Sequence, residues 1–343
     1  MRIALFITGT PFVRGGSEIL VEDLRKQLEA RGHEAELFRI PFIEEFHTGI
    51  FLNALSAQLL DFDDFDLLIS FKWPAYLAVH RRKVFWVFHQ FRQAYDLFGK
   101  QFGLPHTDMG AAIKKMVEQT DAVAFEGGSR VYALSNAANR LGKYCGIGAE
   151  VMHTPLPNLE LYGKNSFGDY IYCACRIDDM KRQALMVEAM RYVKSGVKLV
   201  IDGKCDDEAL LGGLRDAIRK YGLGDKVALS AEFVPEKTKI DRYANCLAGI
   251  YVPIDEDSTG IVLFEAFYSH KTLITTADSG GVADFVNDGE NAFIVEPSPR
   301  AIAEKMDYLY ENKGVAEQMG RNAHGYIVGM DVNWDDTIRR LLG

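Results

Sequence analysis

Cysteine is scarce in this chain, and its positions form no recognisable pair. The five cysteines are Cys145, Cys173, Cys175, Cys205 and Cys246, which give neither a CxxC pair nor the Cys/His spacing of a metal site. Thiols of this kind are typical of small core residues in a reducing compartment. We therefore expect a cytoplasmic protein that holds no metal ion.

Long apolar runs are also missing. No segment approaches the roughly 18 consecutive apolar residues that a membrane-spanning helix needs. Residues 1–7, MRIALFI, predict a short buried strand and not a signal peptide. Any contact with a membrane is therefore expected to be peripheral.

The chain has no excess of positive charge. Its 39 Lys and Arg residues are outnumbered by 48 Asp and Glu residues, which gives a net charge of −9. Nucleic-acid binding needs clustered positive charge, so nucleic acids are not expected partners. The acidic excess lies mainly after Asn158, and the near-neutral part before it is better suited to approach an anionic membrane.

The residues that are present predict an α/β protein of two domains. A length of 343 residues suffices for two cores, and a hydrophobic share of 48% with a charged share of 25% is ordinary for a globular protein. Short apolar runs alternate with amphipathic stretches, as in a parallel sheet wrapped by helices. Strands are expected at residues 3–7, 35–39, 67–70, 84–88, 122–125 and 131–133, and then at residues 170–173, 198–202, 227–229, 248–251 and 272–275.

The segment at residues 154–158, TPLPN, breaks regular structure and is the expected linker. We predict an N-terminal domain over residues 1–157, a C-terminal domain over residues 158–325, and a helical segment over residues 326–343 that packs back across the junction. Two doubly wound domains would leave a cleft where strand carboxyl ends and helix amino ends point at a ligand.

A carboxylate interrupts an apolar stretch at Glu265. Residues 261–267, IVLFEAF, predict a buried helix, in which a charge needs a polar partner. Ser258 or Thr259 can cap this helix, and Gly260 lets a ligand approach its first turn. A phosphate suits the N–H groups there, and Glu265 could reach hydroxyls farther along a nucleotide. The alternative is a capped core helix with its glutamate at a water-filled edge.

Two cations follow the first strand of the second series. Arg176 and Lys181 are five residues apart across a turn, so they can converge on one phosphate at the carboxyl end of that strand. The alternative is a solvated pair that bridges to Asp178 and Asp179.

Two turns carry paired glycines before a helix, at Gly15–Gly16 and at Gly280–Gly281. The first is not GxGxxG, which makes a nicotinamide enzyme a weak prospect. Backbone amides in such turns can bind phosphate or sugar oxygens. A plain loop and a tight strand-to-helix turn are the alternatives.

His89 ends a buried strand, on the expected cleft side of the first sheet. That position favours a functional histidine, and the alternative is a satisfied structural one.

Together these segments resemble the retaining glycosyltransferases of family four, the glycogen synthase and mannosyltransferase-like group 1 enzymes. The resemblance covers nearly the whole chain, in five motifs that stand in the family's order. They are Gly15–Gly16, the phrase Arg31–Gly32–His33 after the first long helix, Arg176 with Lys181, the acidic pair Asp257 and Glu265 followed by Ala266, and Gly280–Gly281. It implies the GT-B fold, in which two Rossmann-like domains face each other.

The chain departs from the family at two acidic positions. Asp257 and Asp284 stand where the family carries glutamate. Because aspartate reaches one methylene less far, either the sugar lies differently or Glu256 serves from the neighbouring position. The departures bear on the donor sugar more than on nucleotide binding.

The resemblance implies transfer of a sugar from a nucleotide-sugar to an acceptor hydroxyl, with retention of configuration. It implies that Arg176 and Lys181 neutralise the diphosphate without a metal or another cofactor, that Glu265 holds the ribose, and that Asp257 and His89 meet the sugar. The other donor-site residues it implies are Gly15, Gly16, Gly203, Lys204, Phe233, Val234, Ser258, Thr259, Gly260, Ile261, Val262, Gly280 and Gly281. No side chain is an obvious covalent nucleophile, so we favour attack on the face that the phosphate leaves.

A UDP-sugar is the favoured donor and GDP-mannose the second. The resemblance implies a saccharide or lipid-linked acceptor and a role in cell-surface polysaccharide or glycolipid synthesis, at the inner face of the plasma membrane. Aromatic and apolar residues of two N-terminal loops, Phe46, Phe51, Phe98, Phe102 and Met109, either meet a lipid-linked sugar or belong to the core. The basic cluster expected at a membrane comprises Lys72, Trp73, Arg81, Arg82 and Lys83.

Two other classes stay open. A nucleotide-sugar epimerase or a sugar phosphorylase could use a similar scaffold, and an epimerase would convert its substrate without an acceptor. A nucleotide-sugar-binding protein of the same fold would bind nucleotide and show no turnover with any donor.

Overall fold

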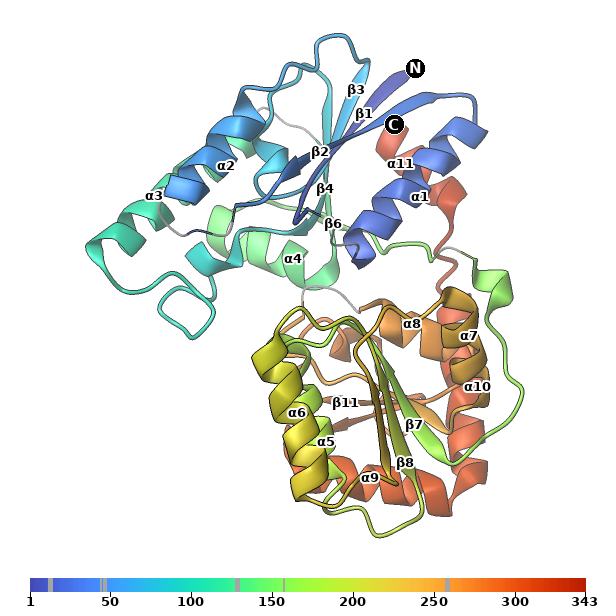
Figure 1. Cartoon of the computed structure of the whole chain (residues 1–343). Coiled ribbons are helices and arrows are strands. Elements are labelled where there is room, and N and C mark those ends of the chain that lie inside the picture. Colours follow the sequence, from blue (N-terminus) through green and yellow to red (C-terminus); the bar gives the residue numbers. More distant parts are fainter. Residues whose placement is uncertain (12–14, 44, 46–47, 127–129, 157, 257–259) are drawn as a thin grey trace. The chain divides into compact units, whose positions relative to one another are not determined.

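The structure is a computed structural model that describes residues 1–11, 15–43, 45, 48–126, 130–156, 158–256 and 260–343. The chain forms two compact units, of which unit 1 comprises Met1–Pro157 with Val332–Gly343 and unit 2 comprises Asn158–Asp331. Each unit has a six-stranded sheet in which every described strand pair is parallel, with helices packed on it (Figure 1). The predicted α/β architecture of two Rossmann-like units is confirmed.

The sheet of unit 1 has the strand order β2-β1-β3-β4-β5-β6. Its strands are β1 (Arg2–Gly9), β2 (Glu34–Pro41), β3 (Leu67–Lys72), β4 (Lys83–His89), β5 (Arg130–Ala133) and β6 (Glu150–Val151). The strand order reverses between β1 and β3, and ligands of open α/β sheets bind outside the strand carboxyl ends at such a point. Residues 3–7 of β1 are fully buried, because a strand covered by helices on both faces needs apolar side chains throughout.

Helices cover both faces of this sheet. They are α1 (Gly16–Ala30), α2 (Thr48–Gln58), α3 (Asp108–Phe125), α4 (Ser135–Arg140) and α11 (Trp334–Leu342), with α1 and α11 on one face and α2 and α3 on the other (Figure 1). The last helix, α11, returns to unit 1, where Ile338 and Leu341 join the core. The chain re-enters unit 1 at Val332, later than the expected boundary at residue 326, because α10 (Lys313–Gly329) continues past it in unit 2.

The strand expected at residues 122–125 is wrong, since these residues form the last turn of α3. Ile113, Val117, Asp121 and Phe125 are buried at intervals of four, which is the spacing of one helix face. Val123 is 65% exposed. The short apolar run at residues 122–125 is therefore part of the helix that begins after the Thr107 cap.

The sheet of unit 2 has the strand order β12-β11-β10-β7-β8-β9. Its strands are β7 (Tyr170–Ala174), β8 (Lys198–Asp202), β9 (Val227–Ser230), β10 (Ala248–Ile250), β11 (Leu273–Thr276) and β12 (Ala292–Val295), of which β12 was not predicted. Here the strand order reverses between β7 and β10, so these two strands mark the switch point of unit 2.

The helices of unit 2 again lie on both faces of its sheet. They are α5 (Gln183–Ala189), α6 (Glu208–Lys220), α7 (Glu236–Asn245), α8 (Ile261–Tyr268), α9 (Pro299–Glu311) and α10. Figure 1 shows α5 and α6 on one face and α7, α8 and α10 on the other. The predicted buried helix at residues 261–267 is confirmed as α8.

Three further observations concern the described residues. No helix among them has the length and apolar character required to cross a membrane. No group of three or more His, Cys, Asp or Glu side chains in these segments is arranged to hold a metal ion. All five cysteines are described and carry free thiols.

Candidate functional site

Predicted residues from three turns gather at the carboxyl edge of the unit 2 sheet. Lys181 lies in the turn after β7, Glu256 in the turn after β10, and Gly280 in the turn after β11. Backbone hydrogen bonds join these turns: Ile254 donates to the carbonyl of Met180 at 2.8 Å, and Glu256 donates to that of Ser279 at 3.2 Å. The switch point of unit 2 is therefore a connected surface of three turns.

Lys181 is held by two partners from the turn after β10. Its Nζ donates to the hydroxyl of Tyr251 at 2.8 Å and forms an ion pair with Glu256. The same hydroxyl donates to Oε2 of Glu256 at 2.7 Å. Tyr251 is buried, and this burial, followed by the charge of Glu256, raises its pKa well above the ordinary value, so the phenol stays protonated. Lys181 is thus a fixed positive charge at the switch point.

Within the described segments, Arg176 and Lys181 form ion pairs with different carboxylates. Nε of Arg176 lies 2.8 Å from Oδ2 of Asp178, and the arginine side chain is 58% exposed. Burial opposes the charge of Arg176, but Asp178 outweighs it and raises the pKa of the guanidinium. Oδ1 of Asp178 accepts the backbone N–H of Lys181 at 3.0 Å. Asp178 therefore orders the turn, and it leaves the arginine accessible to a ligand.

Glu265 has the polar partners that its burial requires. Its side chain is 2% exposed, and Oε1 accepts a hydrogen bond from Tyr162 at 3.1 Å and forms an ion pair with Lys239 of α7. The sequence predicted that this carboxylate needs a partner but did not identify Tyr162 or Lys239. The residues expected beside it in the turn, Asp257, Ser258 and Thr259, lie outside the described residues.

The glycines of this edge let its turns pack against one another. Gly260 has φ +69°, and a Cβ there would lie 2.4 Å from Cε1 of Tyr251. Gly280 has φ +65°, and its Cβ would lie 2.6 Å from the backbone nitrogen of Glu256. Gly281 donates its N–H to the carbonyl of Glu256 at 2.9 Å. These glycines thus shape the protein itself, in addition to any approach of a ligand that the sequence suggested.

The remaining predicted residues of unit 2 lie after β8 and β9 or at the start of α8. A Cβ at Gly203 would lie 1.9 Å from the carbonyl oxygen of Cys175, so this glycine allows the ends of β7 and β8 to meet. Lys204 pairs with Asp206 at 2.5 Å. Phe233 is 68% exposed. Val234 and Ile261 are partly exposed, and Val262 is buried.

Unit 1 presents a smaller polar group at its own carboxyl edge. Nζ of Lys72, at the end of β3, lies 2.9 Å from Oε1 of Glu18 and 3.1 Å from Oγ of Ser17. Gly15, which precedes Gly16 at the start of α1, donates its N–H to Oε2 of Glu18 at 3.0 Å. Burial raises the pKa of Glu18, but Lys72 and this N–H outweigh it, so the pKa lies below its ordinary value. The first glycine turn is therefore tied to a buried ion pair.

His89 is placed at the end of β4, as predicted. Its Nδ1 lies 3.0 Å from the carbonyl oxygen of Gln90. Burial, and then the positive charge of Lys72, lower the pKa of His89 to about 4. The ring is therefore neutral near pH 7, and its contact with a sugar stays a prediction.

The five residues of the expected basic cluster do not form one basic surface. Trp73 is 2% exposed, and Lys72 is used by Glu18. Lys83 donates to the carbonyl of Ala78 at 2.7 Å, and burial lowers its pKa to about 7. Arg82 donates to the carbonyl of Leu342 at 2.9 Å. Lys72 ends β3 whereas Lys83 begins β4, so the parallel pairing of these strands places the two lysines at opposite edges of the sheet, and Arg81 and Arg82 are exposed beside Lys83.

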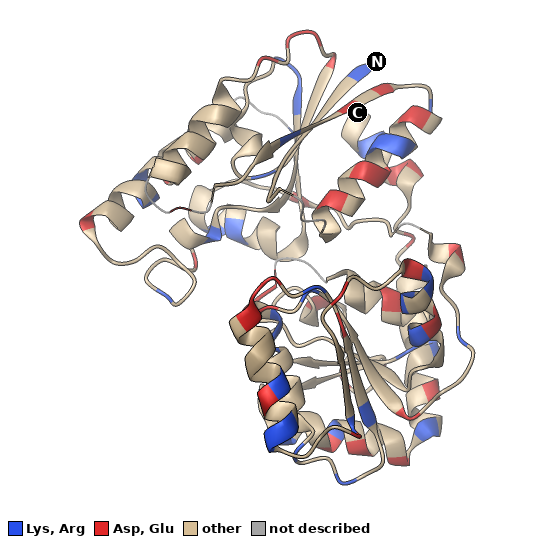
Figure 2. Cartoon of the chain, in the orientation of Figure 1, with Lys and Arg blue, Asp and Glu red and all other residues tan. Residues whose placement is uncertain are grey.

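The aromatic and apolar residues predicted in the two loops of unit 1 differ in their exposure to solvent. Phe51 and Met109 are 46% and 48% exposed, whereas Phe98 packs partly against the core. Phe102 is partly buried, and Phe46 lies outside the described residues. Helix α2 exposes three apolar side chains, Phe51, Leu52 and Leu55. Figure 2 shows no charged residue on this helix.

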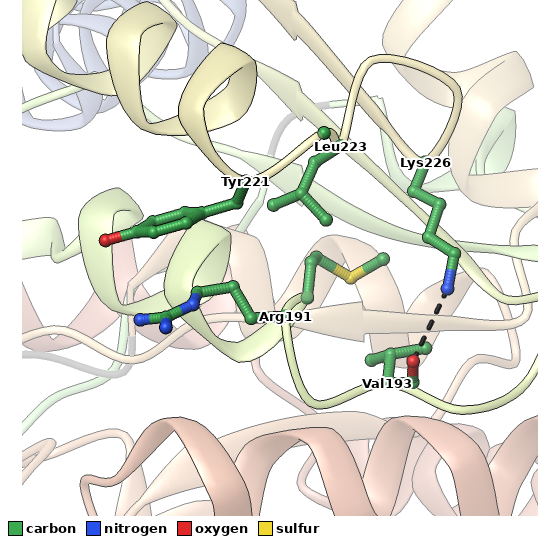
Figure 3. Close-up of a pocket in the computed structure, with 7 residues that line it drawn as sticks. Arg191, Val193, Tyr221, Leu223 and Lys226 are labelled. Atoms are coloured by element: carbon green, nitrogen blue, oxygen red, sulfur yellow. Dashed lines mark hydrogen bonds between the residues drawn. The ribbon is translucent and has the colours of Figure 1, made fainter.

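An open pocket lies at the opposite edge of the unit 2 sheet (Figure 3). It is lined by Met190, Arg191, Val193, Tyr221, Gly222, Leu223 and Lys226, near the amino ends of β8 and β9. The guanidinium of Arg191 lies 4.0 Å from the ring centre of Tyr221, and Lys226 donates to the carbonyl of Val193 at 3.4 Å. The pocket contains none of the predicted site residues.

A model of a known protein family matches most of unit 2. Residues 162–325 match the family model described as Glycosyl transferases group 1. The predicted resemblance to group 1 glycosyltransferases is confirmed over these residues. The comparison with curated proteins found no match.

Solved structures share the fold of the whole chain. Sucrose-phosphate synthase from Thermosynechococcus elongatus is 18% identical with a TM-score of 0.78, over 99% of this chain and 98% of that chain. HepE from Anabaena, solved in complex with UDP and glucose, is 15% identical with a TM-score of 0.71, over 100% and 98%. A glycosyltransferase from Rickettsia africae is 18% identical with a TM-score of 0.73, over 99% and 96%. At these identities the likeness shows the fold, which is the predicted GT-B fold.

Proposed function

We propose that the chain, whose residues 162–325 carry a group 1 glycosyl transferase domain, transfers a sugar from a nucleotide-sugar to a hydroxyl of a saccharide or lipid-linked acceptor. The observation that carries this proposal is the placement of Lys181, Tyr251 and Glu256 at the switch point of unit 2, with Arg176 exposed nearby in sequence. Open α/β sheets bind their ligands at this position. A fixed lysine and an accessible arginine suit a diphosphate.

A UDP-sugar is the favoured donor, with GDP-mannose second. Anabaena HepE, which has the same fold, was solved with UDP and glucose. In this proposal Arg176 and Lys181 bind the diphosphate, and Glu265 of α8 receives the ribose hydroxyls. Because Glu265 is held by Tyr162 and Lys239, its carboxylate is ordered before a nucleotide arrives.

The proposed reaction retains the configuration of the sugar. The bond between the anomeric carbon and the phosphate oxygen breaks, and the acceptor oxygen forms its bond on the same face. The acceptor proton passes to the leaving phosphate oxygen. Arg176 and Lys181 stabilise the negative charge that develops on this phosphate, so the proposal requires no metal. The roles of Asp257 and His89 toward the sugar remain predictions.

The surface of α2 bears on the acceptor and on the setting of the reaction. The uncharged, partly exposed α2 with Phe51, Leu52 and Leu55 favours an apolar partner such as the lipid of a lipid-linked sugar. We propose synthesis of a polysaccharide or glycolipid at the cytoplasmic face of the plasma membrane. The exposed acidic residues that follow α2 would repel anionic headgroups, so the contact proposed here is apolar. These residues are Asp61, Asp63, Asp64 and Asp66.

Calorimetric titration of the purified protein with UDP, GDP and ADP tests the donor site. We expect selective binding of UDP that weakens about tenfold or more in Glu265→Ala, because the ribose loses its carboxylate partner. Glu317→Ala removes a half-exposed carboxylate of α10 and is the matched control. No binding of any of the three nucleotides would contradict a working donor site.

Turnover separates the transferase from its alternatives. Arg176→Ala and Lys181→Ala should each abolish transfer from the nucleotide-sugar that is bound, while the protein still folds. Conversion of the nucleotide-sugar without any acceptor would indicate an epimerase. Nucleotide binding without turnover of any donor would indicate a binding protein of the same fold.

A further inference from the structure

Arg182 has an unusual backbone conformation directly after Lys181. Its φ of 53° and ψ of 43° place it in the left-handed region, between the turn after β7 and the start of α5. A residue with a Cβ is strained there and persists only where the surrounding structure compensates. The compensation should therefore be visible in the contacts of its side chain.

The guanidinium of Arg182 binds the turn that follows β10. Nε donates to the carbonyl of Val252 at 2.6 Å, and Nη2 donates to that of Pro253 at 2.8 Å. These two carbonyls lie between Tyr251 and Glu256, the partners of Lys181. The arginine thus fixes the backbone from which both partners project.

The same guanidinium also binds the turn that follows β11. Nη1 and Nη2 lie 2.8 Å and 2.7 Å from the two carboxylate oxygens of Asp278, and Nη2 lies 2.7 Å from Oγ1 of Thr276. Asp278 precedes Gly280, and its carbonyl accepts the N–H of Asp255 at 2.8 Å. The planar fork of arginine suits this two-oxygen contact.

Asp278 is ionised in its pair with Arg182. Burial raises the pKa of Asp278, but Arg182 and Thr276 outweigh this effect and hold that pKa below its ordinary value. The arginine side chain is 14% exposed, so water competes little for its hydrogen bonds.

We propose that Arg182 is a positioning residue, which locks the turns after β7, β10 and β11 together and so holds Lys181 beside the hydroxyl of Tyr251. The inference rests on the proposed function for the role of Lys181 toward phosphate. The hydrogen bonds of Arg182 go to protein oxygens, and its effect on a ligand passes through Lys181. A purely stabilising arginine would instead leave nucleotide binding unchanged in any variant that folds.

Arg182→Gly is the sharpest variant, because glycine adopts the left-handed conformation without strain and removes the guanidinium. Hydrogen exchange is measured over residues 176–182, 252–256 and 276–281, together with urea unfolding and the affinity for UDP. We expect exchange at least tenfold faster in the last two segments and UDP binding about tenfold weaker. Arg219→Ala, which removes a 78% exposed arginine of α6, should change neither.

A double substitution shows whether the effect passes through Lys181. In the Arg182→Gly background, Lys181→Ala should weaken UDP binding far less than it does in the wild-type protein, since the lysine is already displaced. The proposal would be overturned if the fold-losses in UDP affinity of the two single variants multiplied in the double variant. Unchanged exchange in Arg182→Gly would overturn it as well.

Two further results are also decisive. If Arg182→Gly does not fold, Asp278→Ala replaces it, and faster exchange confined to residues 276–281 is then expected; unchanged exchange there would contradict the clamp. If the wild-type protein binds none of UDP, GDP and ADP, the proposed function fails. The exchange measurement still decides the clamp in that case, because it needs no ligand.

Discussion

The hydroxyl oxygen of Tyr251 lies 2.8 Å from Nζ of Lys181. Tyr251 directly follows β10 and Lys181 lies in the turn after β7, and these two strands are neighbours in the sheet. Glu256 completes the group as the counter-ion of Lys181. A diphosphate that binds Lys181 must therefore compete with the carboxylate of Glu256, which already forms an ion pair with this lysine.

Removal of this competing charge should strengthen nucleotide binding. In Glu256→Gln, Lys181 keeps its contact with Tyr251 but loses its ion pair, so we expect UDP affinity to rise about fivefold, which corresponds to roughly 1 kcal/mol for a partly exposed pair. Calorimetry at low salt, where screening is weakest, is the measurement. Asp216→Asn, which removes an exposed charge of α6, is the control. Weaker binding in Glu256→Gln would mean that Glu256 takes part in ligand binding itself.

Lys239 should contribute to the stability of unit 2 through the buried Glu265. Lys239→Met leaves a carboxylate that is 2% exposed with no cation beside it, and such a loss costs about 3 kcal/mol. Lys237 of the same helix pairs with Asp241 and is 87% exposed, so Lys237→Met should leave the free energy of unfolding nearly unchanged. Urea denaturation of both variants gives the comparison. Equal losses would show that Lys239 is no more important than a surface lysine.

The burial of Glu265 illustrates what the sequence could predict about the site. A carboxylate inside an apolar helix stretch required a polar partner, and the structure provides two. Their identity was not predictable, because Tyr162 precedes β7 and Lys239 belongs to α7, and only packing of the whole unit brings them to α8. Partners distant in sequence leave no local pattern.

Short apolar runs predicted most strands correctly, but such a run cannot by itself be told from one turn of a buried helix. Residues 3–7 and 170–173 were expected as strands and lie in β1 and β7. Residues 122–125 were mistaken for a strand because four residues cannot show the helical period of α3. Arg182 was missed for a different reason, since nothing in its neighbours indicates a left-handed arginine. Its conformation depends on acceptors in two distant turns.

Gly280 should be required because it lacks a side chain as well as because it adopts a left-handed conformation. In Gly280→Ala the new Cβ would lie 2.6 Å from the backbone nitrogen of Glu256, so the turn after β10 must shift. Gly289 is the matched control, because it has φ +76° but nothing within 4 Å of a Cβ. We expect Gly289→Ala to cost about 1 kcal/mol of stability from backbone strain alone. Gly280→Ala should cost about 2 kcal/mol more, in the range of overpacked sites, and should also weaken UDP binding. Equal stability losses and unchanged UDP affinity would contradict this reading of the turn.

The neutral ring of His89 should make unit 1 less stable in acid. Burial, and then the charge of Lys72, lower its pKa from 6.5 to about 4. Between these values the unfolded chain binds a proton that the native protein does not, so the free energy of unfolding falls as the pH falls from 6.5 to 4. The expected loss is about 1–3 kcal/mol, which His89→Gln should remove.

Urea denaturation at about pH 7.5 and pH 4.5 of the wild-type protein and His89→Gln measures this difference. The pKa of His270 is also lowered to about 4, by burial and then by His324, but it contributes equally to both proteins and cancels in the comparison. An equal loss of stability in the two proteins would mean that the ring of His89 is protonated in the native state without penalty. The native pKa of His89 would then lie near its ordinary value of 6.5, and the argument that burial and Lys72 keep the ring neutral would be wrong.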